Sequence, residues 1–333
     1  MKILENVLIS TLTTMRLGGA ARFVIEIEKP DEIATAFSFA KERNLPVFIL
    51  GGGANTIGRD EGFPGVIIMN KMNGIALNDC ILTAMGGEIW DNVVEYACNN
   101  NLTGIEALSK IPGTAGAAPV QNIGAYGQEI SQVFESAEVF DTVDWAFKTL
   151  TATDLSFSYR KSVLNTTERG RYFVVSIKLK LARGEMTRPF YRSIEQYISD
   201  HGETDFSPSS IRRIVSEIRA DKLPDPEFIP SAGSFFKNVY LSDAEAADFE
   251  MDEVPVYRCA EGNKINSGWL IEEAGLSGQL LHGIRVNPKA ALVLINESAQ
   301  SYADLAAARK EIIDTVYNAF GITLEQEPVE IVA

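Results

Sequence analysis

Three observations predict an α+β protein of two or three domains. The chain has 333 residues, and a domain usually has about 100–200. Stretches with strand periodicity and stretches with helix periodicity follow one another along the chain without an internal repeat. The first glycine-rich turn leads from one predicted strand into another, whereas a Rossmann dinucleotide-binding fold requires a helix at that point.

The charge balance excludes several classes of partner. The sequence has 30 Lys and Arg against 45 Asp and Glu, a net charge of −15, so its surface repels nucleic acid and anionic membranes. No apolar run approaches the ~18 residues of a membrane span, and the N-terminal MKILENVLIS lacks a secretory signal. We expect a cytoplasmic monomer with no nucleic-acid or membrane partner.

The cysteines and histidines do not form a metal-binding pattern. Cys80, Cys98 and Cys259 are far apart and have no C-x-x-C spacing, which is typical of reduced thiols in a core. His201 and His282 are also widely separated. A His-rich metal site is therefore excluded, and we predict no metal.

The N-terminal region predicts a strand, a helix and a strand, followed by a glycine turn. Residues 22–28 alternate as a half-buried strand does, 30–43 form the helix, and 46–50 form a buried strand. The core-facing stripe of this helix is Ile33, Ala36, Phe37 and Ala40. The turn is Gly51, Gly52, Gly53, Ala54, Asn55 and Thr56.

The second region, from about residue 64 to 182, has apolar strands at 66–69 and 172–181 and one clear helix at 90–99. The helix presents Trp90, Val93, Val94 and Ala97 on one face. Residues 183–206 are polar and aromatic without strong periodicity, so we interpret them as a connection or flap.

The remaining elements have clear start and stop signals. Ser207 and Pro208 begin a helix that ends before Pro224. In a third region, 229–320, a short helix near 269–274 stops at Gly275 and a long helix occupies 302–320. Ser301 and Asp304 form a possible capping box for this long helix, Gly321 is its stop, and 321–333 read as a final strand.

Two glycine-rich loops are candidate binding segments. The first, 51–56, follows a strand, and its backbone N–H groups could surround an anion; the alternative is a tight turn. The second, 111–127, consists largely of small residues and would allow a flat or extended group to approach closely. Its alternative is a buried loop packed on itself, but two such loops favour a large cofactor. No Gly-Lys-Ser/Thr phosphate loop is present.

Several long motifs together resemble the UDP-N-acetylenolpyruvoylglucosamine reductase family over nearly the whole chain and in the family's order. They are TMRLGGAARF, LGGGANTIGRDEGFPGVII, GIEALSKIPGTAGAAPVQNIGAYGQEI, SYRKS, PSAGSFFKN, NSGWLIEEAG and LEQEPVEI. The resemblance implies a vanillyl-alcohol-oxidase-type (PCMH-type) FAD-binding fold of two subdomains, 1–65 and 66–220, with the flap near 183–206. A substrate domain at 221–320 and a C-terminal strand at 321–333 that returns to the active site would complete it.

The resemblance also implies a reaction. NADPH reduces non-covalently bound FAD, and the flavin then reduces the enolpyruvyl ether of UDP-N-acetylglucosamine to UDP-N-acetylmuramate, a precursor of cell-wall peptidoglycan. Charge that develops beside the substrate carboxylate needs a cation, and the adjacent carbon needs a proton donor. No His or Cys lies in the glycine-rich segments, which agrees with an untethered flavin.

Carried over residue by residue, the resemblance assigns the catalytic roles to Arg160, Ser234 and Glu327. Arg160 would bind the carboxylate, Ser234 would donate the proton, and Glu327 would stabilise the intermediate in a protonated or proton-sharing state. A surface ion pair, a turn serine and a solvated tail carboxylate are the alternatives. The choice of Glu327 over Glu325 rests on the resemblance alone.

The family's ligand positions map onto two further groups of residues. The substrate ligands are Tyr159, Tyr191, Lys222 and Asn238, with Tyr191 in the flap and Lys222 suited to a diphosphate. The predicted FAD ligands are Gly51, Gly52, Gly53, Ala54, Asn55, Thr56, Pro112, Gly113, Thr114, Gly116, Gln121, Asn122, Gly124, Ala125, Tyr126 and Gly127.

Two other functions remain open at this point. Another non-covalent FAD oxidoreductase of the same fold could act on an alcohol or a sugar, and a silent protein could bind nucleotide sugars without turnover. The joint presence of Arg160, Ser234 and Glu327 argues against the silent protein.

Overall fold

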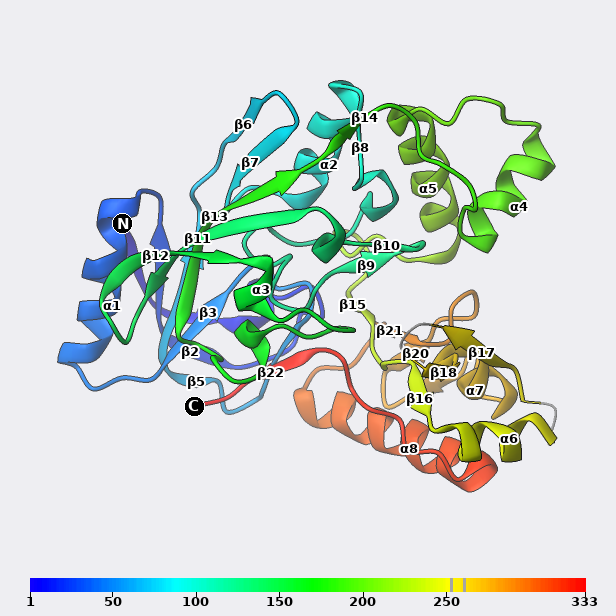
Figure 1. Ribbon diagram of the computed structural model, residues 1–333. Coiled ribbons are helices and arrows are strands. Elements are labelled where there is room, and N and C mark those ends of the chain that lie inside the picture. Colours follow the sequence, from blue (N-terminus) through cyan, green and yellow to red (C-terminus); the bar gives the residue numbers. More distant parts are fainter. Residues whose placement is uncertain (252–253, 260–261) are drawn as a thin grey trace.

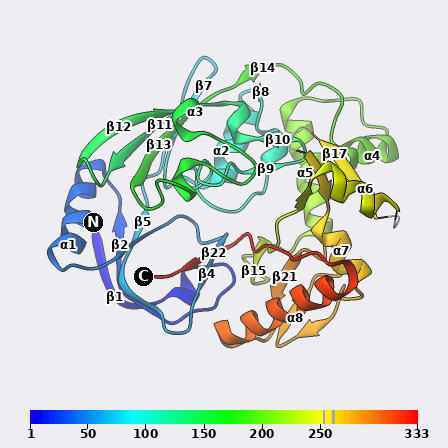
Figure 2. The same ribbon diagram turned by 60° about the horizontal axis from the view of Figure 1, so that its bottom comes forward.

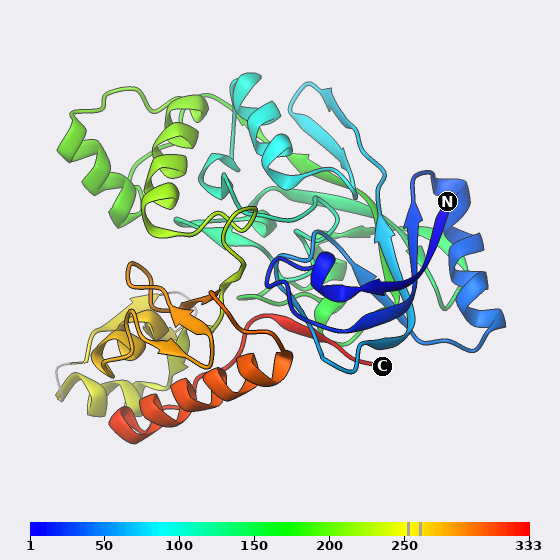
Figure 3. The ribbon, with the colours of Figure 1, turned by 180° about the vertical axis from the view of Figure 1, so that it is seen from behind.

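The computed structural model describes residues 1–251, 254–259 and 262–333. Figure 1 shows a larger body built mainly from sheets and a smaller body of short strands around α7 and α8. The C-terminal tail leaves the smaller body and ends beside the N-terminal strands, which is also visible from behind in Figure 3. The chain therefore crosses between the two bodies twice.

The first sheet has the order β1-β2-β5-β3, with β1 Lys2–Leu8, β2 Ala20–Ile27, β5 Phe63–Asn70 and β3 Val47–Leu50. β2 and β3 are parallel to β5, whereas β1 is antiparallel to β2. Helix α1, Ile33–Glu42, buries its predicted stripe against this sheet. The predicted strands and helix are confirmed, and β4, Thr56–Gly58, follows the glycine turn directly.

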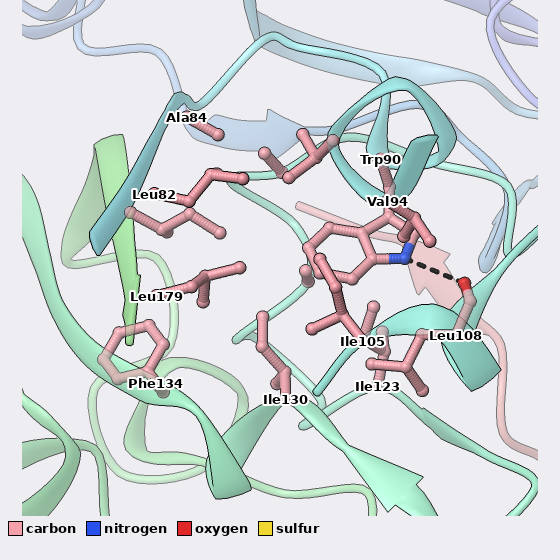
Figure 4. Close-up of a cluster of buried hydrophobic side chains, with 14 of the residues drawn as sticks. Leu82, Ala84, Trp90, Val94, Ile105, Leu108, Ile123, Ile130, Phe134 and Leu179 are labelled. Atoms are coloured by element: carbon pink, nitrogen blue, oxygen red, sulfur yellow. Dashed lines mark hydrogen bonds between the residues drawn. The ribbon is translucent and has the colours of Figure 1, made fainter. Parts of the chain in front are cut away.

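The second sheet is antiparallel, in the order β12-β11-β13-β7-β6. Its strands are β12 Ala146–Thr151, β11 Phe134–Asp141, β13 Tyr172–Lys180, β7 Ile81–Met85 and β6 Ile75–Asn78. Helix α2, Trp90–Asn99, packs on it as predicted, and the indole N–H of Trp90 donates to the Leu108 carbonyl at 3.1 Å (Figure 4).

Short elements complete the larger body. The strands are β8 Leu102–Thr103, β9 Gly124–Ala125, β10 Gln128–Glu129 and β14 Ala182–Arg183, and the one short helix is α3 Ala152–Leu155. The 3-10 turns are η1 Ile9–Thr11, η2 Pro30–Glu32, η3 Glu106–Leu108, η4 Ile130–Gln132 and η5 Val163–Asn165.

The predicted boundary after residue 65 falls inside β5, which pairs along its length within the first sheet. The sheet therefore favours a boundary after Asn70. The domain division itself stays a prediction.

The interpretation of residues 183–206 as irregular is wrong in one respect. Arg192–His201 form helix α4, whose buried side chains are Ile194 and Ile198. They pack against α5, Pro208–Lys222, which begins at the Ser207 cap as predicted. Two apolar residues one turn apart bury enough surface for a ten-residue helix beside a neighbour, although they give too short a pattern to recognise in a sequence.

The described residues of the smaller body form two sheets and three helices. One sheet is β15 Ser231–Ser234, β21 Val293–Asn296, β20 Ile284–Val286 and β19 Leu280–Leu281; the other is β16 Val239–Leu241, β18 Gly262–Ile265 and β17 Val256–Cys259. The helices are α6 Asp243–Met251, α7 Ser267–Glu273 and α8 Tyr302–Phe320. The predicted capping box of α8 and its stop at Gly321, with φ +70°, are confirmed.

The described chain holds neither a membrane-spanning helix nor a gathering of potential metal ligands. Over residues 1–251, 254–259 and 262–333, every helix is too short or too polar to cross a bilayer. The same residues contain no group of three or more His, Cys, Asp or Glu side chains placed to hold an ion. The Cys98 side chain is buried and Cys80 is half-buried, whereas the side chain of Cys259 lies outside the part described.

The C-terminal strand β22, Val329–Ile331, runs parallel to β4 in the larger body (Figure 2). Glu330 anchors it, because its carboxylate accepts hydrogen bonds from Arg59 at 2.5 Å, Tyr302 at 2.7 Å and Arg309 at 2.8 Å. Burial alone would raise the pKa of Glu330, but these three donors lower it to about 2.

We expect Glu330→Gln to destabilise the fold by roughly 1–3 kcal/mol at neutral pH, since hydrogen bonds to a charged group are lost. A lowered pKa contributes stability above the ordinary value of 4.5 that disappears as the pH falls through the folded value. The difference from the unmodified protein should therefore shrink between about pH 4.5 and pH 2 in urea unfolding. Glu61→Gln, an exposed neighbour of Arg59, is the control and should change stability by less than about 0.5 kcal/mol; an equal effect would contradict the assignment.

Candidate active site

The two glycine-rich loops lie against each other. A Cβ atom on Gly52 would stand 2.9 Å from the Cα of Gly113, and one on Gly51 would stand 2.7 Å from the Cβ of Ala117. The side-chain amide of Asn55 donates to that of Gln121. Both segments that the sequence analysis selected therefore belong to one surface.

This surface carries unpaired backbone donors. The N–H groups of Gly52, Gly53 and Ala54 donate no hydrogen bond to any residue of the described chain, and neither do those of Gly113 and Thr114. Unpaired N–H groups in closely packed loops are stabilised by an acceptor-rich ligand. These donors fit the diphosphate of FAD, and the lack of side chains on the glycines would let that group approach the backbone.

The side chain of Asn122 forms hydrogen bonds within the protein. Its side chain is 1% exposed, and its amide nitrogen donates to Glu129 at 2.8 Å and to the Ser158 carbonyl at 3.2 Å. Its amide oxygen accepts the N–H of Ser131 at 3.1 Å. Among the predicted FAD ligands, Asn122 thus fixes the shape of the loop and ties it to the turn that carries Arg160.

Arg160 and Glu327 form an ion pair, although they are far apart in the sequence. Nε of Arg160 lies 3.2 Å from Oε1 of Glu327, and their side chains are 19% and 9% exposed. Nη2 of Arg160 also donates to the Gly124 carbonyl in the second glycine loop at 3.1 Å. The guanidinium therefore stands between the Gly124 carbonyl of the second glycine-rich loop and a buried carboxylate.

The C-terminal tail brings Glu327 to Ser234. The N–H of Glu327 donates to the Phe235 carbonyl at 2.9 Å, and the N–H of Lys237 donates to the Glu325 carbonyl at 2.9 Å. Ser234 immediately precedes this paired segment, at the end of β15, and the described residues offer its hydroxyl no hydrogen-bond partner. Phe235 and Phe236 are fully buried and hold the segment in place.

Burial distinguishes the two glutamates that the sequence left open. Glu325 is 73% exposed and pairs with Lys237. Burial raises the pKa of the Glu327 carboxyl above its usual range, and Arg160 and Lys237 offset only part of that rise. Of the two carboxyls, Glu327 is the one whose surroundings favour a bound proton.

Two pockets contain predicted site residues. One, of ≈ 380 Å³, is lined by Arg160, Glu327, Gln121, Lys237 and Asn165 among others. The other, of ≈ 870 Å³, is lined by Tyr191 and Lys222, together with residues of α4, α5 and β17.

The remaining predicted ligands form links between the segments of the site. Asn238 donates to the Tyr159 hydroxyl at 3.4 Å, so two predicted substrate ligands from different bodies touch. Tyr191 lies edge-on to Tyr126, with ring centroids 5.8 Å apart. The predicted flap thus contacts the second glycine-rich loop through Tyr126.

Sequence reasoning missed several polar residues of the smaller pocket, among them Lys237 and Asn165. Lys237 stands inside a recognised motif but was given no role, although its charge lies near both Glu325 and Glu327. Asn165 carried no signal, because an asparagine in a polar loop has many ordinary uses and its partner is known only from the fold.

Comparison with known proteins agrees with this geometry. Residues 21–144 match the FAD binding domain, and residues 225–331 match the C-terminal domain of UDP-N-acetylenolpyruvoylglucosamine reductase. The reductase of Vibrio vulnificus strain YJ016 is 33% identical over 333 residues, covering 98% of this chain and 94% of its own. The chain belongs to the UDP-N-acetylenolpyruvoylglucosamine reductase family.

Other members of the reductase family support the same assignment. The Pseudomonas aeruginosa reductase is 32% identical over 335 residues, covering 98% of both chains. The crystal structure of the Thermus caldophilus reductase superposes with a TM-score of 0.69 at 24% identity, covering 100% of both chains. The predicted family and fold class are confirmed.

We expect Gly52→Ala to weaken flavin binding, because its Cβ would overlap the backbone of Gly113. Overpacking of this kind costs about 1–3 kcal/mol, which corresponds to about 5- to 150-fold weaker binding. Flavin content after purification and dialysis measures the effect. Gly170→Ala, at a left-handed glycine with no atom within 4 Å of the new Cβ, should retain its flavin, and equal loss in both variants would show that the contact is unimportant.

A second prediction concerns the pH dependence of Glu327. Because its folded pKa is raised, Glu327 contributes stability below its ordinary pKa of 4.5 and loses that contribution as the pH rises through the folded value. Glutamine cannot ionise, so the stability of Glu327→Gln relative to the unmodified protein should increase from acidic to neutral pH. Thermal unfolding across this range measures the trend, with the exposed Glu325→Gln as control; a flat difference for Glu327→Gln would contradict the raised pKa.

Proposed function

We propose that this chain catalyses the NADPH-dependent, FAD-mediated reduction of the enolpyruvyl ether of UDP-N-acetylglucosamine to UDP-N-acetylmuramate. The observation that carries this proposal is the buried ion pair of Arg160 and Glu327 next to Ser234. The proposal is supported by a cation suited to a carboxylate, a carboxyl with a raised pKa and a hydroxyl on the adjoining segment, beside loops that fit FAD.

Bound FAD supplies hydride transfer, from NADPH in one half-reaction and to the substrate alkene in the other. Arg160 binds and orients the enolpyruvyl carboxylate, since a guanidinium presents parallel donors to a planar carboxylate. As negative charge moves into that carboxylate, the fixed cation stabilises it without reorganisation.

Ser234 delivers the proton that completes the reduction. Its hydroxyl is free of protein hydrogen bonds within the described chain, so it can turn to the substrate carbon. A serine is a weak acid, and it needs a neighbour that stabilises the developing charge. Lys237, three residues along the same segment, and Glu327, whose pKa is raised by burial, are the candidates.

The larger pocket suits the rest of the substrate. Lys222 brings a cation to the C-terminal end of α5, and Tyr191 of the flap lines the same pocket. We assign the diphosphate to these two side chains and the sugar end to Tyr159 and Asn238. A monomer in the cytoplasm and an untethered flavin belong to the same proposal, supported by the acidic surface and by the absence of His and Cys from both flavin loops.

One anaerobic titration tests the proposal. The purified yellow protein should be bleached by NADPH and reoxidised by the enolpyruvyl sugar nucleotide, with UDP-N-acetylmuramate as product. Reoxidation by an alcohol or a simple sugar instead would identify another flavin oxidoreductase of this fold. A colourless protein that only binds the nucleotide sugar would refute the enzymatic function, and flavin that stays on the denatured chain would refute the untethered cofactor.

Ser234→Ala should affect only the second half-reaction. General acid assistance is worth about 10²–10⁴-fold in rate, and flavin reduction by NADPH needs no proton donor at this position. The variant should remain yellow, bleach at the normal rate, and reoxidise slower by that factor in stopped-flow absorbance. Ser234→Cys should retain more activity, because a thiol can also donate a proton. Reoxidation of Ser234→Ala at the unmodified rate would move the acid to another group, with Glu327 first.

Tyr191→Phe should weaken binding of the sugar nucleotide while leaving reduction by NADPH nearly unchanged. The change removes one hydroxyl from the larger pocket and keeps the ring contact with Tyr126, so a loss of about 10- to 150-fold in affinity is expected for a missing hydrogen bond to a charged group. Titration of the oxidised protein measures it. Equal damage to both half-reactions would indicate that the flap residue is structural.

A further inference from the structure

The backbone of Arg160 is held in a left-handed conformation. Its φ is +55°, a region that is unfavourable for a residue with a side chain and that persists where the surroundings enforce it. On either side of this residue, the N–H of Ser158 donates to the Lys161 carbonyl and the N–H of Lys161 donates to the Ser158 carbonyl, each at 3.0 Å. Tyr159 and Arg160 therefore occupy the two tip positions of a tight turn.

Asn165 secures this turn from one side. Its amide nitrogen donates to the carbonyl of Arg160 at 3.1 Å, and its amide oxygen accepts the N–H of Ser162 at 2.9 Å. One planar side chain thus fixes the peptide that follows the left-handed residue. Asn165 also lines the pocket that contains Arg160 and Glu327.

Two other hydrogen bonds attach the same turn to the second flavin loop. Asn122 donates to the Ser158 carbonyl at 3.2 Å, and the Ser162 hydroxyl donates to the Val120 carbonyl at 2.7 Å. These contacts set where the turn lies on the loop. The Asn165 contact is different, because it is made to the carbonyl of Arg160 itself.

We propose that Asn165 is a positioning residue for the reduction, holding Arg160 in the backbone conformation from which its guanidinium meets the substrate carboxylate. This inference rests on the proposed function. The planar guanidinium of Arg160 must be aligned with the planar carboxylate of the substrate to bind it through two hydrogen bonds. When the Asn165 amide is lost, the turn can relax to a more favourable φ, and the Cα–Cβ bond of Arg160 then points elsewhere.

Two variants separate the contacts of Asn165. Asn165→Ala removes both of them. Asn165→Asp has nearly the same volume and keeps the acceptor for Ser162, but it places an oxygen against the Arg160 carbonyl where a donor stood. Asn100→Ala is the matched control, because it removes an amide-to-carbonyl hydrogen bond of 2.8 Å on the surface of α2.

Binding to two nucleotide sugars gives a readout that does not depend on turnover. UDP-N-acetylmuramate carries the lactyl carboxylate that Arg160 would bind, whereas UDP-N-acetylglucosamine lacks it. In calorimetric titrations, both Asn165 variants should bind UDP-N-acetylmuramate about 10- to 100-fold more weakly, the effect of a misplacement of about 1 Å. They should bind UDP-N-acetylglucosamine within about twofold of the unmodified protein, as should Asn100→Ala with both ligands.

The two half-reactions should also respond differently to the loss of Asn165. Flavin reduction by NADPH should stay within about twofold in the Asn165 variants, and reoxidation by the enolpyruvyl sugar should slow by at least about tenfold. In an Arg160→Ala background, Asn165→Ala should add less than about twofold to the loss, because a residue that acts through Arg160 has nothing left to position.

Other outcomes would overturn the inference. Equal losses for both nucleotide sugars, equal losses in both half-reactions, or full additivity with Arg160→Ala would each mean that Asn165 only stabilises the loop. Should Asn165→Ala fail to fold, Asn165→Asp carries the same comparisons. Failure of the proposed function would look different, since the unmodified protein itself would then not be reoxidised by the enolpyruvyl sugar.

Discussion

The pairing of the C-terminal tail with two separate bodies is the constraint on which the site depends. Residues 325–327 hydrogen-bond with the segment after Ser234, and β22 then pairs with β4 directly after the first glycine loop. The bond from the Val329 N–H to the Asn55 carbonyl, 3.0 Å long, joins the tail to that loop itself. One short stretch of chain therefore sets the separation between the first glycine-rich loop, Glu327 and Ser234.

Electrostatics within the site follow from this geometry. Burying two charges costs more than a surface pair returns, so the ion pair of Arg160 and Glu327 is better explained by chemistry than by stability. A carboxylate that reaches Arg160 shares its cation with Glu327, which makes ionised Glu327 less favourable. Binding of such a carboxylate thus raises the pKa of Glu327 further.

Local patterns predicted much of the fold but few of its contacts. The helices at 90–99 and 302–320 have long apolar stripes, the second also has clear caps, and the structure places both as expected. Helix α4 was missed because its buried face consists of only two isoleucines. The candidate catalytic residues came from the family's motifs. The distinction between Glu325 and Glu327 and the link from Asn165 to Arg160 depend on burial and long-range contact, and no local pattern encodes them.

The acidic surface and the cationic site act over different distances. A net charge of −15 repels a nucleotide sugar far from the protein, but this repulsion is screened beyond about 8 Å at physiological salt. Within the smaller pocket, Arg59, Arg160, Arg169 and Lys237 face two carboxylates, Glu327 and Glu330. At contact distance the excess of cations dominates, because low-dielectric surroundings strengthen nearby charges more than distant ones. The local charges of this pocket, and not the overall field, therefore favour a small anionic ligand that enters it.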